Sequence, residues 1–203
     1  MGKKAVDIVL LPDEAAMKVI IRANAELISR FGEEIVLNKK DCLPHISLAM
    51  GCIDEANIST VKGILETMAA RHRLGRLRVI GVYTSVDSEG RKVSVFVVEK
   101  TQQLQRLHEE IMAGLGPYLS NEVSSEMLFD SEVKETTLLW IRNYRAKSSF
   151  GNFLPHITIG YGQPTETNLP IEFTASRLAM CHLGNHCTCR KILAEVEFGE
   201  GKK

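Results

Sequence analysis

Two short stretches of the sequence share a pattern of residues that can carry out proton transfer. The first is Pro44-His45-Ile46-Ser47-Leu48-Ala49 and the second is Pro155-His156-Ile157-Thr158-Ile159-Gly160. Position by position, both contain a proline, a histidine, an isoleucine, a hydroxyl residue, an aliphatic residue and a small residue. A third combination, His186-Cys187-Thr188, lacks the proline and the isoleucine, and we interpret it as part of a turn. We therefore expect the chain to be organised around the first two stretches.

Two histidine and hydroxyl pairs of this kind suit the cleavage of a phosphodiester. A neutral imidazole can accept a proton from the attacking group while a second, protonated imidazole donates one to the departing oxygen. The hydroxyls of Ser47 and Thr158 can donate to non-bridging phosphate oxygens, and each such charge-assisted bond contributes roughly 1.5 to 3 kcal/mol. The pattern predicts His45 and His156 as the catalytic pair, and no metal ion is needed.

Both stretches are predicted to be strands, because a proline disfavours helix at the residue before it and the residues that follow suit a pleated strand. Side chains at positions i and i+2 of a strand project from the same face. His45 and Ser47 therefore share one face, as do His156 and Thr158. The proline and aliphatic residues between them fill the opposite face, which we expect to pack on a core while the polar face lines a cleft.

The rest of the chain is predicted as two similar strand-helix-strand halves in a single domain spanning residues 1–203. Predicted strands cover residues 6–11, 35–37, 43–50, 77–84, 93–98, 177–183 and 186–198, with turns at 87–90 and 184–185 and a loop at 163–170. Predicted helices begin at Asp13, Asp54 and Thr101 and end near Gly32, Gly75 and Gly116. The second half carries an insertion at residues 121–150, with a helix at 132–144. A pseudo-twofold arrangement would set the motif strands side by side.

The paired motifs and this layout resemble the two-histidine (2H) phosphoesterase superfamily, which includes cyclic phosphodiesterases and the 2′-5′ RNA ligases. The resemblance implies a bilobal α+β fold, with antiparallel-rich sheets around a central cleft and helices on the outside. It implies that His45 and His156 are catalytic and that Ser47 and Thr158 orient the phosphate. It also implies substrates with a 2′,3′-cyclic phosphate or a 2′-5′ linkage and no cofactor. Serine at position 47, where the family favours threonine, keeps the hydroxyl.

The composition limits the partners of the chain. Its 203 residues include 25 acidic and 25 basic side chains, and zero net charge argues against coating of long nucleic acid by charge alone. The N-terminal stretch has no apolar segment typical of a signal peptide, and no apolar run is long enough to span a bilayer. Five cysteines without a regular spacing favour a reducing compartment over a disulfide scaffold. We expect a cytoplasmic protein that binds a cyclic nucleotide or a short RNA end, without a membrane or protein partner.

Several other residues have two interpretations each. Tyr161, directly after the second motif, can stack on a substrate base or can be a half-buried aromatic at a strand end. The arginines at positions 71, 73, 76 and 78, and the basic residues 142, 145 and 147, can steer RNA or can be solvated surface. The cluster of Cys181, His182, His186, Cys187 and Cys189 does not match a zinc spacing, although a hairpin would let His182, Cys187 and Cys189 converge. His72 and His108 are expected to be structural or solvated.

Three functions remain compatible with these motifs. A phosphodiesterase that hydrolyses cyclic phosphates or 2′-5′ linkages is the first. A module that binds a nucleotide or RNA end without turning it over is the second, although such a module has no need of two proton-transfer groups. A ligase that joins 2′-5′ ends is the third, because acid and base roles are reversible.

Overall fold

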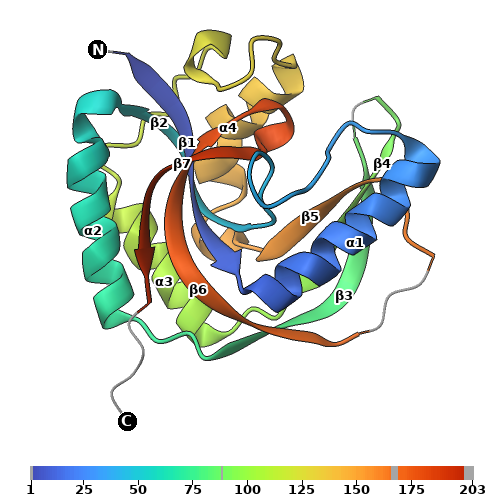
Figure 1. Ribbon diagram of the computed structural model, residues 1–203. Coiled ribbons are helices and arrows are strands. Elements are labelled where there is room, and N and C mark those ends of the chain that lie inside the picture. The colour runs from blue at the N-terminus through green and yellow to red at the C-terminus, as the bar shows by residue number, and fades with distance from the viewer. Residues whose placement is uncertain (1, 88, 166–168, 199–203) are drawn as a thin grey trace.

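The computed structural model describes residues 2–87, 89–165 and 169–198, and within them the strands form one seven-stranded sheet (Figure 1). The strands are β1 (Lys3–Pro12), β2 (Ile46–Asp54), β3 (Arg76–Val86), β4 (Lys92–Val98), β5 (His156–Tyr161), β6 (Ile171–Leu183) and β7 (Cys189–Glu197). Their order is β2-β1-β6-β3-β4-β5, with β7 also paired to β6, and every pair is antiparallel. The predicted α+β class with antiparallel sheets is confirmed.

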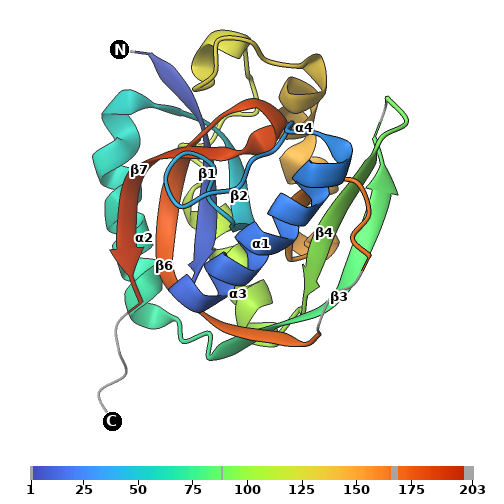
Figure 2. The ribbon, with the colours of Figure 1, turned by 45° about the vertical axis from the view of Figure 1, so that its right-hand side comes forward.

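The long strand β6 joins the two halves of the sheet. Its first residues pair with β3, and its later residues pair with β1 on one side and β7 on the other. Figures 1 and 2 show β6 as a long curved strand that passes from one half to the other. The motif strands β2 and β5 end the order at opposite edges, so they are not hydrogen-bonded neighbours in the sheet. They still approach each other within 8 Å between α-carbons, because the sheet curves.

Four helices are found in the described residues: α1 (Glu14–Phe31), α2 (Ile58–Arg71), α3 (Gln102–Gly114) and α4 (Glu135–Lys147). Helix α1 starts where the sequence predicts, because the Asp13 side chain accepts a hydrogen bond from the Ala16 amide. It ends at Gly32, whose φ of 103° is open to glycine at little cost. Thr101 caps α3 in the same way. Figure 1 shows α1 crossing one side of β5, with α2 and α3 on the opposite side of the molecule.

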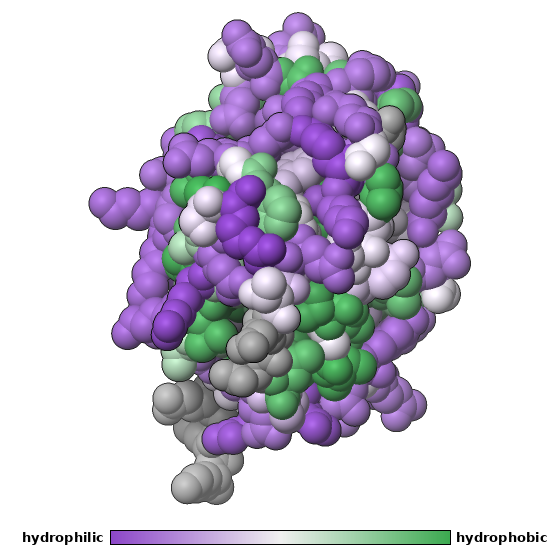
Figure 3. Space-filling model, turned by 90° about the vertical axis from the view of Figure 1, so that its right-hand side faces the viewer, coloured by the Kyte–Doolittle hydropathy of each residue, from purple (hydrophilic) through white to green (hydrophobic). Residues whose placement is uncertain are grey.

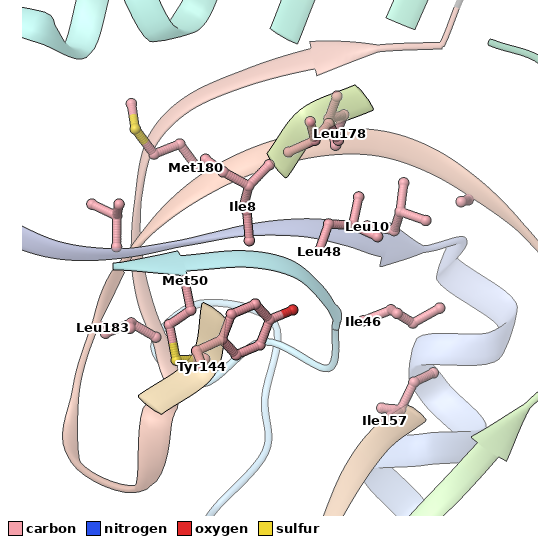
Figure 4. Close-up of a cluster of buried hydrophobic side chains, with 14 of the residues drawn as sticks. Ile8, Leu10, Ile46, Leu48, Met50, Tyr144, Ile157, Leu178, Met180 and Leu183 are labelled. Atoms are coloured by element: carbon pink, nitrogen blue, oxygen red, sulfur yellow. The ribbon is translucent and has the colours of Figure 1, made fainter. Parts of the chain in front are cut away.

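The two motif strands bury their aliphatic residues as predicted. Ile46 and Leu48 of β2 and Ile157 and Ile159 of β5 have no exposed surface. Ile46 and Ile157 lie close together at one end of the cluster drawn in Figure 4, so the two strands share a core where the sheet edges approach. Each fully buried side chain of this size contributes roughly 1.5 to 3 kcal/mol to folding. The apolar faces of the motifs thereby fix the position of their polar faces.

The prediction of a strand at residues 35–37 is wrong, because the backbone of this segment forms hydrogen bonds with the side chain of Asn24. Asn24 Nδ2 donates to Ile35 O, and Asn24 Oδ1 accepts from Leu37 N, both at 2.8 Å. The same Nδ2 donates to Ile159 O of β5 at 2.8 Å. A buried amide of α1 therefore ties this loop to the second motif strand, where a sheet ladder was expected.

Helix α2 also differs from its prediction at both ends. Asp54 makes no capping hydrogen bond, and a short 3-10 turn, η1 (Glu55–Asn57), precedes the helix. The helix ends at Arg71 rather than near Gly75. The predicted turn at 87–90 and the predicted loop at 163–170 extend into residues 88 and 166–168, which lie outside the described residues.

The connection between β6 and β7 is longer than the predicted two-residue turn. Its 3-10 turn η4 (Asn185–Cys187) contains His186 and Cys187 with positive φ, and Gly184 N donates to Thr188 O at 2.9 Å. The reason for the longer turn is the Asn185 side chain, which accepts from Lys134 N and Thr137 Oγ1 at the start of α4. The turn is therefore docked on the insertion.

One face of the molecule is mostly polar. Figure 3 shows hydrophilic side chains over most of one face, with apolar ones gathered in its lower part. None of the described helices has both the length and the apolar character needed to cross a bilayer.

Candidate active site

The two motif histidines have the same local geometry. His45 Nδ1 lies 2.7 Å from Leu43 O, and His156 Nδ1 lies 2.7 Å from Leu154 O. In each case a carbonyl two residues back can only accept, so Nδ1 carries the proton and donates it. Each Nε2 then keeps its lone pair, and this is the atom that can accept a proton in an acid-base reaction.

The hydroxyl residues lie on the same faces as the histidines. Ser47 and Thr158 are partly exposed, whereas Leu48 and Ile159 beside them are fully buried. The four predicted site residues therefore lie on or directly beside two strands, β2 and β5, that approach within 8 Å between α-carbons. Thr158 Oγ1 makes no hydrogen bond within the described residues, and this hydroxyl is available to a ligand.

A β-bulge in β5 adds Tyr161 to the motif face. Strand β4 pairs Val95 with Thr158, but Ser94 with Gly160 and Val93 with Tyr161, so one residue of β5 is extra. Strict alternation would place Tyr161 on the opposite face, and the bulge reverses that. Gly160 permits it with a φ of 125°, and a Cβ there would lie 2.9 Å from Asn24 Nδ2.

Tyr161 is already engaged by neighbouring side chains. Its hydroxyl accepts from Arg91 Nη2 at 3.0 Å and lies 3.2 Å from His186 Nδ1. The Arg91 guanidinium lies over the ring, 4.3 Å from its centroid. The ring face that could stack on a base thus carries an arginine, which can itself contact a phosphate or a base.

Two cavities flank this end of β5. The smaller, about 260 Å³, is lined by Phe31, Glu34, Arg91, Lys92, Tyr161 and Gly162. The larger cavity, about 570 Å³, is also lined by Glu34, and its lining includes Cys42, Asp130 and His186. Neither of these two cavities is lined by His45 or His156, so the predicted placement of both histidines in one cleft stays a prediction.

Asp7 is a site residue that the sequence interpretation missed. It lies in the middle of β1 with no exposed surface, and its Oδ2 is 2.5 Å from Ser47 Oγ. The same oxygen is 3.7 Å from His45 Nε2. Burial raises the pKa of this carboxyl well above its usual range, against a smaller lowering by the Ser47 hydrogen bond. A single aspartate within the apolar run of residues 5–11 was the signal that could have identified it.

Burial also decides the charge of the histidines. It lowers the pKa of His45 to about 4, while the Leu43 hydrogen bond opposes this and the nearby His156 adds to it. Burial lowers the pKa of His156 as well, against the Leu154 hydrogen bond. Both imidazoles are therefore neutral near pH 7 in the free protein. A bound phosphate anion would favour the protonated form of whichever ring lies beside it.

The insertion packs against the first motif strand. Its predicted helix at 132–144 is observed as α4, and Tyr144 from this helix is buried. Figure 4 shows Tyr144 below β2, next to Met50, with its hydroxyl directed toward the Ile46 end of the strand. Burial raises the pKa of Tyr144 well above its usual range, and the Asp7 carboxyl adds to this rise. The charge of Asp7 therefore acts on a side chain of the insertion.

His108 joins the two motif segments, which confirms its expected structural role. Phe150 N donates to His108 Nε2 at 2.7 Å, so Nδ1 carries the proton and donates to Leu48 O of β2 at 2.7 Å. The ring is stacked on Phe153, with centroids 4.0 Å apart. His72 is also engaged, with Nε2 3.1 Å from Glu110 Oε2. One buried imidazole thus links β2 with the segment that leads into β5.

The basic run at 71–78 is largely paired with acidic side chains. Arg76 and Arg78 contact Glu172, and Arg78 also approaches Glu99. Arg73 donates to three backbone carbonyls at the end of α2. These contacts favour the interpretation of this run as surface structure.

One pair of cysteines differs from the expectation that the chain is not built on disulfides. Cys181 and Cys189 form a disulfide with a Cα–Cα distance of 5.4 Å, while Cys42, Cys52 and Cys187 are unpaired. His182 pairs with Lys191 rather than Cys187, so His182, Cys187 and Cys189 do not converge as a simple hairpin would require. No group of three or more potential metal ligands is present in residues 2–87, 89–165 and 169–198.

Comparison with known proteins places these motifs in a family. The family described as the 2′-5′ RNA ligase superfamily matches residues 37–186, which include both motif strands. No curated protein matches the chain in sequence.

Solved structures share the fold at low sequence identity. The crystal structure of TT0787 of Thermus thermophilus is 16% identical, with a TM-score of 0.59, and the match covers 96% of this chain and 97% of that one. The crystal structure of Escherichia coli LigT with phosphate is 12% identical, with a TM-score of 0.51, and covers 98% and 100%. LigT with NADP+ is 13% identical, with a TM-score of 0.50 and the same coverage.

Proposed function

The chain belongs to the 2′-5′ RNA ligase superfamily, within the two-histidine phosphoesterases, and we propose that it is a metal-independent phosphodiesterase. Its proposed substrates carry a 2′,3′-cyclic phosphate or a 2′-5′ linkage at a nucleotide or RNA end. The observation that carries the proposal is the matched pair of histidines. Each has its Nδ1 bound to a backbone carbonyl at 2.7 Å and its Nε2 left for proton transfer, with a hydroxyl two residues further along the strand.

The reaction needs one proton acceptor and one proton donor. Water attacks phosphorus while one imidazole Nε2 takes a proton from that water, and the bond from phosphorus to a ribose oxygen breaks. The second imidazole gives its proton to the departing oxygen, so one proton is taken up and one is released. Each of these steps typically contributes ~10² to 10⁴-fold to the rate.

We assign His45 as the base and His156 as the acid. The side chain of His45 is 14% exposed, and burial lowers its pKa to about 4, which favours its neutral form. His156 Nε2 has no hydrogen-bond partner in the described residues, and a bound phosphate anion would favour the charged form of this ring. Thr158 and Ser47 would then donate to the non-bridging oxygens.

Structures of the same fold support a phosphate site. Escherichia coli LigT has been crystallised with phosphate and with NADP+, and both ligands contain the group that the hydroxyls of Ser47 and Thr158 suit. Because those chains are 12% and 13% identical to this one, they support the fold and not the choice of nucleotide.

The test is an assay of the purified protein in EDTA against nucleoside 2′,3′-cyclic monophosphates, cyclic-phosphate-ended oligonucleotides and 2′-5′-linked dinucleotides. The wild type should form product, and His45→Ala and His156→Ala should lose ~10² to 10⁴-fold in turnover. Identifying the product as a 2′- or 3′-phosphate shows which bond breaks. Binding of these ligands without any product, at every pH from 5 to 9, would favour a binding module instead.

Ligation of 2′-5′ ends is a second candidate, favoured by the family that the chain matches. It uses the same two histidines in the reverse direction, because acid and base exchange roles when a reaction is reversed. The assay separates the two by supplying a cyclic-phosphate end together with a free 5′-hydroxyl end. A joined product that accumulates at high concentrations of 5′-hydroxyl ends would assign ligation.

A further inference from the structure

Asp7 is an acid in surroundings that do not suit a charge. It lies opposite Met50 of β2 and Cys181 of β6, with fully buried Val6 and Ile8 beside it in β1. Within the described residues its Oδ1 has no hydrogen-bond partner, and Oδ2 has only Ser47. An ionised carboxylate in such a place would leave lone pairs unsatisfied and a charge unpaired, which is strongly unfavourable.

The groups that face Asp7 come from three elements. Strand β2 provides the Ser47 hydroxyl at 2.5 Å, and the residue just before it provides His45 Nε2 at 3.7 Å. Asp7 also acts at longer range on Tyr144 of α4 and Cys187 of η4: burial raises the pKa of each, and the Asp7 carboxyl adds to the rise. No lysine or arginine forms an ion pair with Asp7 in the described part of the chain. A negative charge on Asp7 would therefore have only the Ser47 hydroxyl and, if protonated, the His45 imidazolium to stabilise it.

The protonation state of Asp7 determines what Ser47 can do. A serine hydroxyl has one proton to donate and two lone pairs that accept. If Asp7 is ionised, Ser47 must donate its proton to the carboxylate and has none left for a substrate. If Asp7 is protonated, its carboxyl O–H can donate to Ser47 Oγ, and the Ser47 proton then points away from Asp7.

We propose that protonated Asp7 is a positioning residue, which donates to Ser47 Oγ so that Ser47 donates to the substrate phosphate, and which leaves His45 neutral as the base. This inference rests on the proposed function. Ser47 would thereby match Thr158, whose hydroxyl makes no hydrogen bond in the described residues. An ionised Asp7 would instead hold His45 as an imidazolium and repel the phosphate.

Asp7→Asn distinguishes the two protonation states, because its amide always donates and has nearly the same shape. We expect Asp7→Asn to keep kcat/KM within ~3-fold of wild type near pH 7, because the donor to Ser47 is preserved. Asp7→Ala and Ser47→Ala should each lose ~10 to 10²-fold. The double variant Asp7→Ala/Ser47→Ala should lose no more than Ser47→Ala alone, because Asp7 acts through Ser47. Ser149→Ala, which removes another buried hydroxyl, is the control.

The opposite pattern would overturn the proposal. If Asp7→Asn loses as much activity as Asp7→Ala at an unchanged melting temperature, Asp7 works as an anion. If the losses in the double variant multiply, Asp7 does not act through Ser47. Should Asp7→Ala not fold, Asp7→Asn alone and in combination with Ser47→Ala still give both comparisons.

Two measurements test Asp7 without the enzymatic reaction. The infrared spectrum at pH 7 should contain the carbonyl band of a buried protonated carboxyl group, and this band should vanish in Asp7→Asn. Inorganic phosphate should bind Asp7→Asn as tightly as wild type, and Ser47→Ala ~10-fold more weakly. If no substrate in the panel is cleaved but these results hold, the proposed function fails while the role of Asp7 stands. Absence of the band in wild type would refute the role of Asp7.

Discussion

The two motif strands carry the same side chains in different surroundings. At β2, the hydroxyl of Ser47 is hydrogen-bonded to a buried carboxyl, and His45 Nε2 lies 3.7 Å from the same group. At β5, neither Thr158 nor His156 Nε2 has a hydrogen-bond partner in the described chain, and the bulge at Gly160 brings Tyr161 onto the same face. A repeated motif therefore produces one enclosed half and one open half.

This difference comes from the strands beside the motifs rather than from the motifs themselves. The neighbour of β2 is β1, which presents Asp7, whereas the neighbour of β5 is β4, which presents the valines at positions 93, 95 and 97 to the same face. A pair of identical imidazoles needs such an asymmetry to perform opposite roles in one reaction.

The largest effect that we expect from this asymmetry is on the dependence of rate on the leaving group. His45→Ala and His156→Ala should both lose ~10² to 10⁴-fold with a cyclic phosphate. With an aryl phosphodiester, whose leaving group needs no proton, His156→Ala should recover most of its rate and His45→Ala should not. The measurement is kcat for each variant with bis(p-nitrophenyl) phosphate and with a nucleoside 2′,3′-cyclic monophosphate.

If His45→Ala recovers its rate with the aryl phosphodiester and His156→Ala does not, His45 is the acid and His156 is the base. Equal losses with both substrates in both variants would mean that the halves are equivalent. His72→Ala is a suitable control, because this histidine contacts Glu110 away from both motifs.

The second effect is on stability. His45 and Asp7, the buried titratable groups of the enclosed half, change the free energy of unfolding in opposite directions as the pH rises. The pKa of His45 is lowered to about 4, so between pH 4 and 6.5 the unfolded chain binds more protons there, and stability rises with pH. The total is ~3 kcal/mol, present above pH 6.5 and lost as the pH falls toward 4. The pKa of Asp7 is raised, so above the ordinary aspartate range the folded chain binds more protons there, and stability falls as pH rises.

Urea unfolding of Asp7→Asn and His45→Ala from pH 4.5 to 6.5 separates these terms. Relative to wild type, Asp7→Asn should gain stability as pH rises, by up to about 1.4 kcal/mol per pH unit. His45→Ala should lose stability relative to wild type over the same range, with a slope of similar size. Parallel curves for wild type and Asp7→Asn would show that the carboxyl is ionised in the folded protein.

The sequence predicts the faces of the two motif strands well because their periodicity is local. Alternation along two short strands was enough to place His45 with Ser47 and His156 with Thr158, and capping residues placed the ends of α1 at Asp13 and Gly32. What it did not predict depends on partners distant in the chain. The residues near 35–37 fail to form a strand because Asn24 binds them, and Asn185 extends its turn because it binds α4.

Asp7 is an example from the site itself of a feature that depends on partners distant in the chain. An isolated aspartate in an apolar strand is visible in the sequence, but its meaning depends on the register of β1 against β2. The bulge between Ile8 and Val9 sets that register and brings Asp7 to Ser47. Tyr161 is the counterpart in β5, because alternation places it on the wrong face until the bulge there is known.

A third effect compares the two hydroxyls. Thr158→Ala removes a donor that has no other partner in the described residues, and should weaken kcat/KM by ~10 to 10²-fold with little change in stability. Ser47→Ala should weaken kcat/KM by a similar factor and should also destabilise the protein, by roughly 1 to 3 kcal/mol, because Asp7 then loses its partner.

Kinetics and urea unfolding of both variants check this contrast, with Thr158→Ser and Ser47→Thr as conservative controls that keep each hydroxyl. Equal stability of Thr158→Ala and Ser47→Ala would show that the Ser47 contact with Asp7 contributes nothing to the folded state.

The smallest expected effect concerns Tyr161 in the open half. Tyr161→Phe removes the hydroxyl that Arg91 Nη2 and His186 Nδ1 approach but keeps the ring beneath the Arg91 guanidinium. Stability should fall by about 0.5 to 1.5 kcal/mol, as for the loss of one net hydrogen bond, and kcat/KM should stay within ~3-fold of wild type. Tyr83→Phe, at a tyrosine that is 61% exposed, should change neither quantity. A tenfold loss of kcat/KM in Tyr161→Phe at unchanged stability would mean that the hydroxyl itself contacts the substrate, and the open half would then extend along β5 beyond its motif.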